Sequence, residues 1–294
     1  MEPIFFALPG NEEITQRLTK LLNATRGKVL IRHFPDGETY VQLQSDVKGK
    51  RAVLVCTLDR PDEKIVPLYF LSQTAKELGA EQICLIAPYL AYMRQDLRFH
   101  TGEGITSNYF GFLLTQFIDG LITVDPHLHR KSSLSEVYGV RCKVVHAAGH
   151  IAAWIKQHIV KPVLVGPDRE SVQWVSVVAD QARAPFVVLD KVRHGDKEVE
   201  VYFPDMANYR EHTPVLVDDI ISTARTMIAA IGSLKEMGMK APVCVGVHGI
   251  FAGNAYQDIM QAGAADVITT NTISHQSNRI DISDLLEGAF RDLI

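Results

Sequence analysis

Two adjacent carboxylates, Asp218 and Asp219, follow a short apolar run in the segment VLVDDIISTART. Neighbouring carboxylates repel one another and are costly to desolvate unless ribose hydroxyls or a magnesium-bound sugar offset the cost. The turn at 222–226 then opens an apolar pattern of helical period, so its N–H groups and hydroxyls point at an anion site above a helix N-terminus. Helix capping by Asp, Ser or Thr is the alternative, but the whole pattern favours a sugar phosphate.

Four further polar segments follow predicted strands. Arginine binds phosphate as a planar fork, and a cationic pair beside a phosphate site suits transition-state stabilisation. For each segment taken alone, a turn, a solvated loop or a charged hairpin is an adequate explanation. His127 and His129 raise the possibility of zinc, but no partner set has metal-ligand spacing. The segments are HFPDGETYVQL (33–43), APYLAYMRQDLRFHTGEGITS (87–107), ITVDPHLHRKSS (122–133) and GPDRESVQW (166–174) with VVLDKVRHGDKEVEV (187–201).

Short apolar runs rich in Val, Ile and Leu alternate with stretches of helical period along the chain. Continuous apolar strands that alternate with helices predict parallel sheets covered on both faces, so the fold class is α/β. In such sheets ligands bind beyond the carboxyl ends of the strands. The runs at 83–90 and 162–170 are similar, which hints at duplication. We predict two domains, 1–143 and 144–294, and leave open that the last helix packs on the first.

The composition and charge of the chain argue against nucleic acid and membrane as its partners. The chain has 294 residues, 47% hydrophobic and 22% charged, with a net charge of −4. It has no basic footprint for nucleic acid, no apolar stretch of the ~20 residues that span a bilayer and no signal-peptide pattern at its N-terminus. Its four cysteines are far apart in apolar runs, which indicates reduced core thiols in the cytoplasm. We therefore expect a cytoplasmic protein that binds neither nucleic acid nor a membrane.

The segment VLVDDIISTART resembles the ribose-phosphate-binding signature of type I phosphoribosyltransferases and of ribose-phosphate pyrophosphokinases, the PRPP synthetases. The second family is favoured because 33–43 is similar to its FPDGE motif and Tyr92 begins a match to its Y-x-R-Q-D motif. The segment at 122–127 is similar to its T-V-D-x-H motif, and Asp190 begins a match to D-K-x-R. The resemblance covers nearly the whole chain, with the motifs in the family's order.

Two departures stand out. The usual loop carries two glycines where this chain has Ala224 and Arg225, and a non-glycine residue pays roughly 1 kcal/mol for a positive φ. After His129 the family's aromatic-rich continuation is replaced by RKSSLSEVYG. The second departure bears on any family-type subunit contact through that loop.

The resemblance implies two phosphoribosyltransferase-like domains, each a mainly parallel sheet flanked by helices. It implies transfer of the diphosphoryl group of ATP to the 1-hydroxyl of ribose 5-phosphate, giving PRPP and AMP, with Mg²⁺. It also implies a homo-oligomer, dimer or hexamer, with the active site near a subunit interface. The residues carried over are Lys191, Arg193 and His127 for catalysis; His127 and Asp168 near the metal; Phe34, Asp36 and Glu38 from a neighbouring subunit, with Arg94, Gln95 and Asp96, for ATP; and Asp218, Asp219, Ser222, Thr223, Ala224, Arg225 and Thr226 for ribose 5-phosphate.

Two other functions stay open. A catalytically weak, PRPP-synthetase-associated regulatory protein would fit the altered loop, but it has no need of Lys191, Arg193 or His127. A phosphoribosyltransferase that consumes PRPP would fit the same loop, but the FPDGE and YMRQD segments argue against it because they form the ATP site in the resembled family. ATP binding in the absence of PRPP would separate these two classes.

Overall fold

The computed structural model describes residues 1–128, 133–167, 171–194, 198–202 and 206–293, with the backbone alone for 190–194 and 198–202. The chain forms two compact units. The first comprises Met1–His146, Thr272–Ser274 and Ile282–Ile294, and the second comprises Ala147–Asn271 and His275–Asp281. In the described residues, no helix combines the length and the apolar character needed to cross a membrane.

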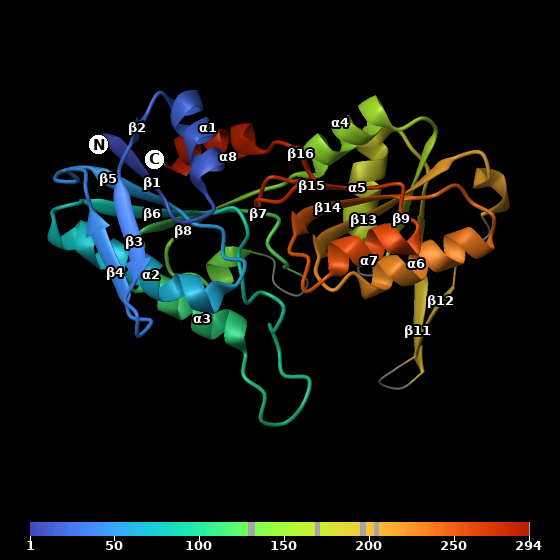
Figure 1. Cartoon of the computed structure of the whole chain (residues 1–294), viewed down its shortest axis with the longest axis horizontal. Helices are drawn as coiled ribbons and strands as arrows, with labels where there is room; N and C mark the ends of the chain where they lie inside the picture. The colour runs from blue at the N-terminus through green and yellow to red at the C-terminus, as the bar shows by residue number, and fades with distance from the viewer. Residues whose placement is uncertain (129–132, 168–170, 195–197, 203–205, 294) are drawn as a thin grey trace. The chain divides into compact units, whose positions relative to one another are not determined.

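The first unit is built on a six-stranded sheet in the order β2-β1-β5-β6-β7-β8, in which all neighbouring strands are parallel. Helices α1 and α8 lie on one side of this sheet, and α2 and α3 lie on the other (Figure 1). The strands are β1 (Pro3–Ala7), β2 (Thr25–Arg26), β5 (Arg51–Val55), β6 (Gln82–Ala87), β7 (Gly120–Val124) and β8 (Arg141–Val145), and the helices are α1 (Glu12–Leu22), α2 (Pro61–Glu77), α3 (Thr106–Thr115), the 3-10 turn η1 (Leu134–Glu136) and α8 (Ser283–Leu293).

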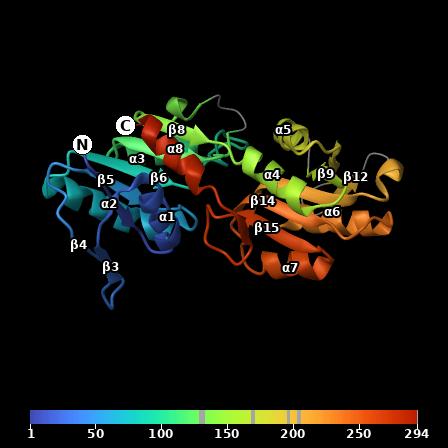
Figure 2. The same cartoon turned by 90° about the horizontal axis from the view of Figure 1, so that it is seen from above.

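The C-terminal helix α8 belongs to the first unit, beside β7 and β8 (Figure 2). The Phe290 ring packs 5.1 Å from the Phe5 ring of β1, and both side chains are almost fully buried. Lys143 Nζ donates to Asp292 Oδ2 at 2.7 Å. The apolar face of the last helix therefore completes the core of the first unit.

The second unit repeats this plan with the order β10-β9-β13-β14-β15-β16, again parallel throughout. Figure 2 shows α5 and α7 on opposite sides of the sheet. The strands are β9 (Pro162–Gly166), β10 (Phe186–Val188), β13 (Thr213–Ile221), β14 (Val243–Gly249), β15 (Asp266–Thr270) and β16 (Asn278–Ile280), and the helices are α4 (Ala148–His158), α5 (Val172–Ala182), the 3-10 turn η3 (Ala207–Tyr209), α6 (Arg225–Glu236) and α7 (Ala255–Ala262).

Both sheets share one strand order: the first strand of each is second in its sheet, with the second strand at the edge and the later strands on the other side. The hint of duplication in the sequence therefore agrees with the topology, and the α/β class with parallel sheets is confirmed. In this order the connections change direction between β1 and β5, and between β9 and β13. Ligands of open α/β sheets bind at such switch points, beyond the carboxyl ends of the strands.

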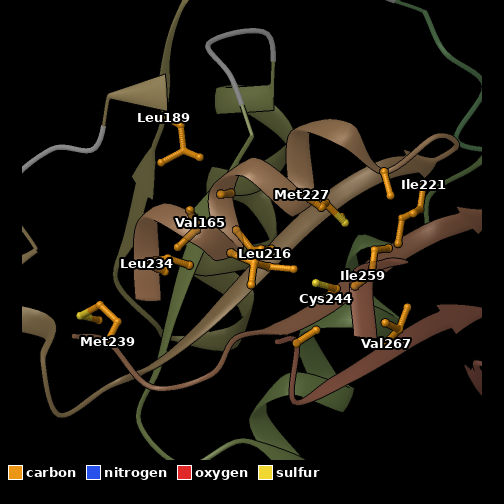
Figure 3. Close-up of a cluster of buried hydrophobic side chains, with 14 of the residues drawn as sticks. Val165, Leu189, Leu216, Ile221, Met227, Leu234, Met239, Cys244, Ile259 and Val267 are labelled. Atoms are coloured by element: carbon orange, nitrogen blue, oxygen red, sulfur yellow. The ribbon is translucent and has the colours of Figure 1, made fainter. Parts of the chain in front are cut away.

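A cluster of buried side chains joins the second sheet to α6 and α7. Leu216 and Cys244 of the sheet meet Met227 and Leu234 of α6 and Ile259 of α7 (Figure 3), and all five are at most 2% exposed. Burying such a side chain contributes about 1.5–3 kcal/mol each. This packing fixes where β13 ends and α6 begins.

Two expectations about the strands were wrong. The strand that carries Asp218 and Asp219 does not end on them, because β13 continues to Ile221 in register with β14. The prediction that the short apolar runs form parallel sheets was wrong for KVLIRHF (28–34), because β3 (Val29–His33) pairs antiparallel with β4 (Thr39–Leu43) in a separate hairpin. A short apolar run specifies a strand but not its partner.

Candidate active site

The loop between β13 and α6 consists of Ser222, Thr223 and Ala224, and α6 begins at Arg225. Ala224 is the N-cap residue and adopts the left-handed conformation, with φ 59° and ψ 7°. Its methyl group is buried in the cluster beneath the loop, since the residue is 8% exposed. The alanine therefore takes the backbone shape for which a glycine is the usual residue.

The N-terminus of α6 is not capped by its N-cap side chain, because alanine has no oxygen to accept a hydrogen bond. The capping explanation for this segment required Asp, Ser or Thr at that position. The first N–H groups of a helix favour a bound anion. Ser222 is half-buried beside them, while Thr223 and Arg225 are exposed and Thr226 lies in the first turn. The loop thus has the form of an anion cradle.

Asp218 and Asp219 are half-buried near the carboxyl end of β13. The Asp219 N–H donates to Asp218 Oδ1 at 2.9 Å. Neighbouring residues of a strand direct their side chains to opposite faces, so the two carboxylates flank the strand end and do not lie side by side. Each can approach a ligand above the loop from its own side.

The topology brings a second predicted segment to this place. β9 is the direct neighbour of β13, and its loop follows Gly166 at the switch point of the second sheet. Asp168 follows Gly166 by two positions and lies outside the described residues. A Cβ at Gly166 would lie 2.6 Å from Ser171 Oγ, so the backbone there tolerates no side chain.

Lys191 and Arg193 lie on β11 (Asp190–His194), which pairs antiparallel with β12 (Glu198–Tyr202). This hairpin extends beyond the second sheet (Figure 1). The two cationic positions are two residues apart on β11. Their side chains lie outside the described part of the chain.

The FPDGE segment forms the tip of the β3–β4 hairpin. Gly37 has a φ of 92°, the Glu38 N–H donates to Asp36 Oδ1 at 3.1 Å, and Asp36 and Glu38 are exposed. The Phe34 ring is 40% exposed, and the Arg32 guanidinium lies 4.7 Å from its centroid. A cation over an aromatic face is attractive, so the ring is held at the tip while one face stays accessible.

Arg94, Gln95 and Asp96 lie in the loop between β6 and α3. Arg94 is exposed, while Gln95 and Asp96 are half-buried. The Ser107 N–H of α3 donates to the Gln95 carbonyl at 3.3 Å. Tyr92, with a φ of 59°, donates its hydroxyl to Asp62 of α2, which raises the pKa of the phenol. In Figure 1 this loop lies well away from the tip of the β3–β4 hairpin.

His127 is half-buried just beyond β7, the strand next to β6. Before it, Asp125 has a φ of 34°, and its side chain is only 6% exposed. His146 Nδ1 bonds Asp125 Oδ1 at 2.7 Å, and this hydrogen bond raises the pKa of His146. The sequence analysis missed His146. Its only signal was its place near the end of the apolar run KVVHA, directly after β8, the strand beside β7.

The switch point of the first unit is filled by its own chain. Asn11 is 2% exposed; its Oδ1 accepts from the Thr57 N–H at 2.9 Å, and its Nδ2 donates to the Leu8 and Pro9 carbonyls. Thr57 Oγ1 donates to the Thr272 carbonyl at 2.7 Å. The side chains of Asn11 and Thr57 are thus satisfied by hydrogen bonds within the first unit.

The described residues contain no group of three or more His, Cys, Asp or Glu side chains that could hold a metal ion. A magnesium ion in phosphoryl transfer usually takes one or two carboxylates and completes its shell with water and substrate phosphates. The half-buried carboxylates Asp218 and Asp219 lie at the switch point, where a magnesium-bound sugar would meet them, and His127, which the resemblance assigns to the metal, is half-buried beyond β7. The residues present therefore fit a magnesium ion that arrives with its substrate.

Comparison with known proteins covers both units. Residues 4–117 match the family model for the N-terminal domain of ribose phosphate pyrophosphokinase, and residues 142–284 match that for the phosphoribosyl transferase domain. A ribose-phosphate pyrophosphokinase of Saccharolobus solfataricus is 33% identical over 278 residues, which cover 94% of each chain. The chain belongs to the ribose-phosphate pyrophosphokinase family. The family predicted from the motifs is therefore confirmed.

Other relatives agree with this assignment. The pyrophosphokinase family also includes a Sulfurisphaera tokodaii protein of that name, 30% identical over 283 residues, covering 95% of this chain and 96% of the relative. A crystal structure of phosphoribosylpyrophosphate synthetase from Mycobacterium smegmatis superposes with a TM-score of 0.85 at 24% identity, covering 99% of this chain and 98% of that one. The structural similarity confirms the fold of two phosphoribosyltransferase-like domains.

Proposed function

We propose that the chain is a ribose-phosphate diphosphokinase, which transfers the diphosphoryl group of ATP to the 1-hydroxyl of ribose 5-phosphate and forms PRPP and AMP. The observation that carries the proposal is the conformation of Ala224. Despite the loss of glycine, the loop keeps a left-handed turn at a helix N-terminus whose N-cap side chain makes no hydrogen bond, at the switch point of the second sheet. A relative that had lost its sugar-phosphate site would have no need to keep this strained backbone.

In this proposal the 5-phosphate accepts hydrogen bonds from the N–H groups and hydroxyls of 222–226, and the Arg225 guanidinium adds a cation at the rim. Asp218 and Asp219 accept from the ribose hydroxyls and orient the 1-hydroxyl. Holding the two substrates in a reactive geometry can supply several kcal/mol of the barrier lowering. Because phosphoryl transfer needs little covalent chemistry from the protein, this orientation is a main contribution of the loop.

The remaining charges are assigned to the nucleotide and the transferred group. Arg94 binds phosphate oxygens, Gln95 and Asp96 bind the nucleotide, and Lys191 and Arg193 neutralise charge that develops on the transferred diphosphoryl group. A magnesium ion bound with ATP would supply Lewis-acid polarisation of the phosphate oxygens, which favours attack on the β-phosphorus. His127 and Asp168 are assigned to hold the ion near the phosphates.

We further propose a homo-oligomer in which the hairpin tip with Phe34, Asp36 and Glu38 serves the ATP site of a neighbouring subunit. The separation of that tip from the Arg94 loop within one chain supports this arrangement (Figure 1). The outer surfaces of α2 and α3 also expose an unusual number of large apolar side chains. Such surfaces on a folded chain mark contact with a partner. They are Val66, Tyr69 and Phe70 on α2 and Tyr109, Phe112 and Leu113 on α3, all at least 40% exposed. A cytoplasmic location fits the four unpaired thiols.

The test is AMP release from Mg-ATP with and without ribose 5-phosphate, with mass spectrometry for PRPP. We expect both products only when the sugar is present. The variant Asp219→Asn, which keeps the size of the side chain and removes its charge, should raise the KM for the sugar more than that for ATP. ATP binding without any AMP would refute the proposal and favour the regulatory protein or another sugar acceptor, which a panel of sugar phosphates would identify.

A further inference from the structure

The segment after β14, Ile250–Ala252, is bonded to the base of the sugar-phosphate loop. The N–H groups of Ile250 and Phe251 both donate to the Ile221 carbonyl at 3.0 Å. The Ala252 N–H donates to the Ser222 carbonyl, also at 3.0 Å. The last residue of β13 and the first residue of the loop are thus fixed by three hydrogen bonds from one neighbouring segment.

Phe251 holds this segment in place. Its backbone has a φ of 47°, and its ring is 9% exposed. The ring lies 4.5 Å from the His275 ring and 5.4 Å from the Tyr256 ring, and these two rings lie 5.0 Å apart. Each such aromatic pair is worth about 0.5–1.5 kcal/mol beyond its area, so three mutual contacts can offset the cost of the left-handed backbone.

Two glycines of β14 make room for these contacts. A Cβ at Gly249 would lie 2.5 Å from the Phe251 ring, and a Cβ at Gly246 would lie 2.7 Å from the Ile221 side chain. Both distances are too short for any real side chain. The buried cluster that includes Phe251 also contains Ala224. Ile221 and Met227, beside the loop, belong to the same cluster (Figure 3).

We propose that Ile250–Ala252 is a backbone clamp for the sugar-phosphate loop and that Phe251 is its positioning residue. The clamp holds the carbonyl side of the loop, so the N–H groups of 222–226 are pre-oriented before an anion binds. Phe251 acts through Ile221 and Ser222 and does not touch the substrate. The inference rests on the proposed function for the identity of the ligand, and the geometry of the clamp stands independently of it.

The test compares Phe251→Ala with Met239→Ala. Both remove a large side chain from the same buried cluster, in which Met239 lies at the opposite end from Ile221 (Figure 3). In Phe251→Ala the amides of 250–252, which donate the three hydrogen bonds of the clamp, should exchange hydrogen about tenfold faster. The KM for ribose 5-phosphate should rise about tenfold, with kcat and ATP affinity little changed. Phe251→Leu, which keeps apolar bulk, should restore part of both effects.

The two readouts separate the two ideas. Unchanged exchange at 250–252 in Phe251→Ala would overturn the clamp. Equal effects of Met239→Ala on exchange and on the KM would mean general destabilisation of the unit, which would also overturn it. If the wild-type protein forms no PRPP while the exchange rates change as expected, the proposed function fails and the clamp stands. If the wild-type protein forms PRPP but exchange is unchanged in Phe251→Ala, the clamp fails and the proposed function stands.

Discussion

Replacing Ala224 with glycine should leave the stability of the second unit nearly unchanged, although it removes a strained alanine. A left-handed backbone costs an L-residue about 1–2 kcal/mol, which glycine would recover. Against this, the variant loses a methyl group buried in the cluster, worth about 0.8 kcal/mol. Glycine also gives the unfolded chain more freedom, which costs about 0.4–1 kcal/mol. The opposing terms are equal to within about 1 kcal/mol.

Arg183 provides a matched control. It follows α5 with φ 55° and ψ 45°, so its backbone is as left-handed as that of Ala224, but its side chain is exposed. Arg183→Gly recovers the strain without losing a buried methyl group. We therefore expect Arg183→Gly to stabilise the unit by roughly 0.5–1 kcal/mol, and Ala224→Gly to fall below it by about the value of one buried methyl group.

Urea unfolding followed by tryptophan fluorescence measures both variants. The chain has two tryptophans, Trp154 and Trp174, and both lie in the second unit with the two substituted positions. The signal therefore reports this unit alone, and unchanged m-values would license comparison of the midpoints. Equal stabilisation by the two glycines would refute the reasoning, because it would mean that the Ala224 methyl contributes nothing to the cluster.

Three further outcomes are expected. Lys191→Ala should lower kcat by two or more orders of magnitude, about 3 kcal/mol of transition-state stabilisation, with ATP binding retained; Lys235→Ala, an exposed cation in the last turn of α6, should not. Phe112→Glu should shift the mass in light scattering toward the monomer, and an unchanged mass would place the subunit interface elsewhere. Because Asp125 raises the pKa of His146 above 6.5, their pair stabilises the fold below that pH and loses its effect as pH rises through the raised value. The decrease in Tm between about pH 6 and pH 8 should therefore be smaller in His146→Gln, and an equal decrease would show that the pair does not matter.

Much of the fold could be predicted from the sequence because parallel sheets have a strong local signal. Strands buried on both faces are continuous apolar runs, and the intervening helices carry their own period. The β3–β4 hairpin was misassigned because VLIRH has the same local composition as a core strand. Helix α1 was overlooked because EEITQRLTKLL is mostly polar, with Ile14 and Leu18 as its buried contacts to the core.

The candidate site was predictable where it depends on position along the chain. Strand ends meet at one edge of a sheet, so the polar segments after them were sound candidates without knowledge of the order of the strands. The supporting contacts were not predictable. The bonds from Ile250–Ala252 to Ile221 join residues far apart in sequence, and the left-handed conformation of Ala224 contradicts the usual preference of alanine. The roles assigned to the individual site residues stay predictions.

The two units share one strand order, but the residues at their switch points differ in the hydrogen bonds that they make. In the first unit Asn11 and Thr57 occupy the switch point with hydrogen bonds to neighbouring backbone, which leaves their polar groups with little capacity for a ligand. In the second unit the loop after β13 has an alanine N-cap with no side-chain oxygen, and this loop is held from behind by the backbone of Ile250–Ala252. Satisfying polar groups internally stabilises a fold, whereas leaving helix N–H groups uncapped costs stability and gives an anion a place to bind. The alanine N-cap and the hydrogen bonds from Ile250–Ala252 therefore support the proposal that the anion site lies in the second unit.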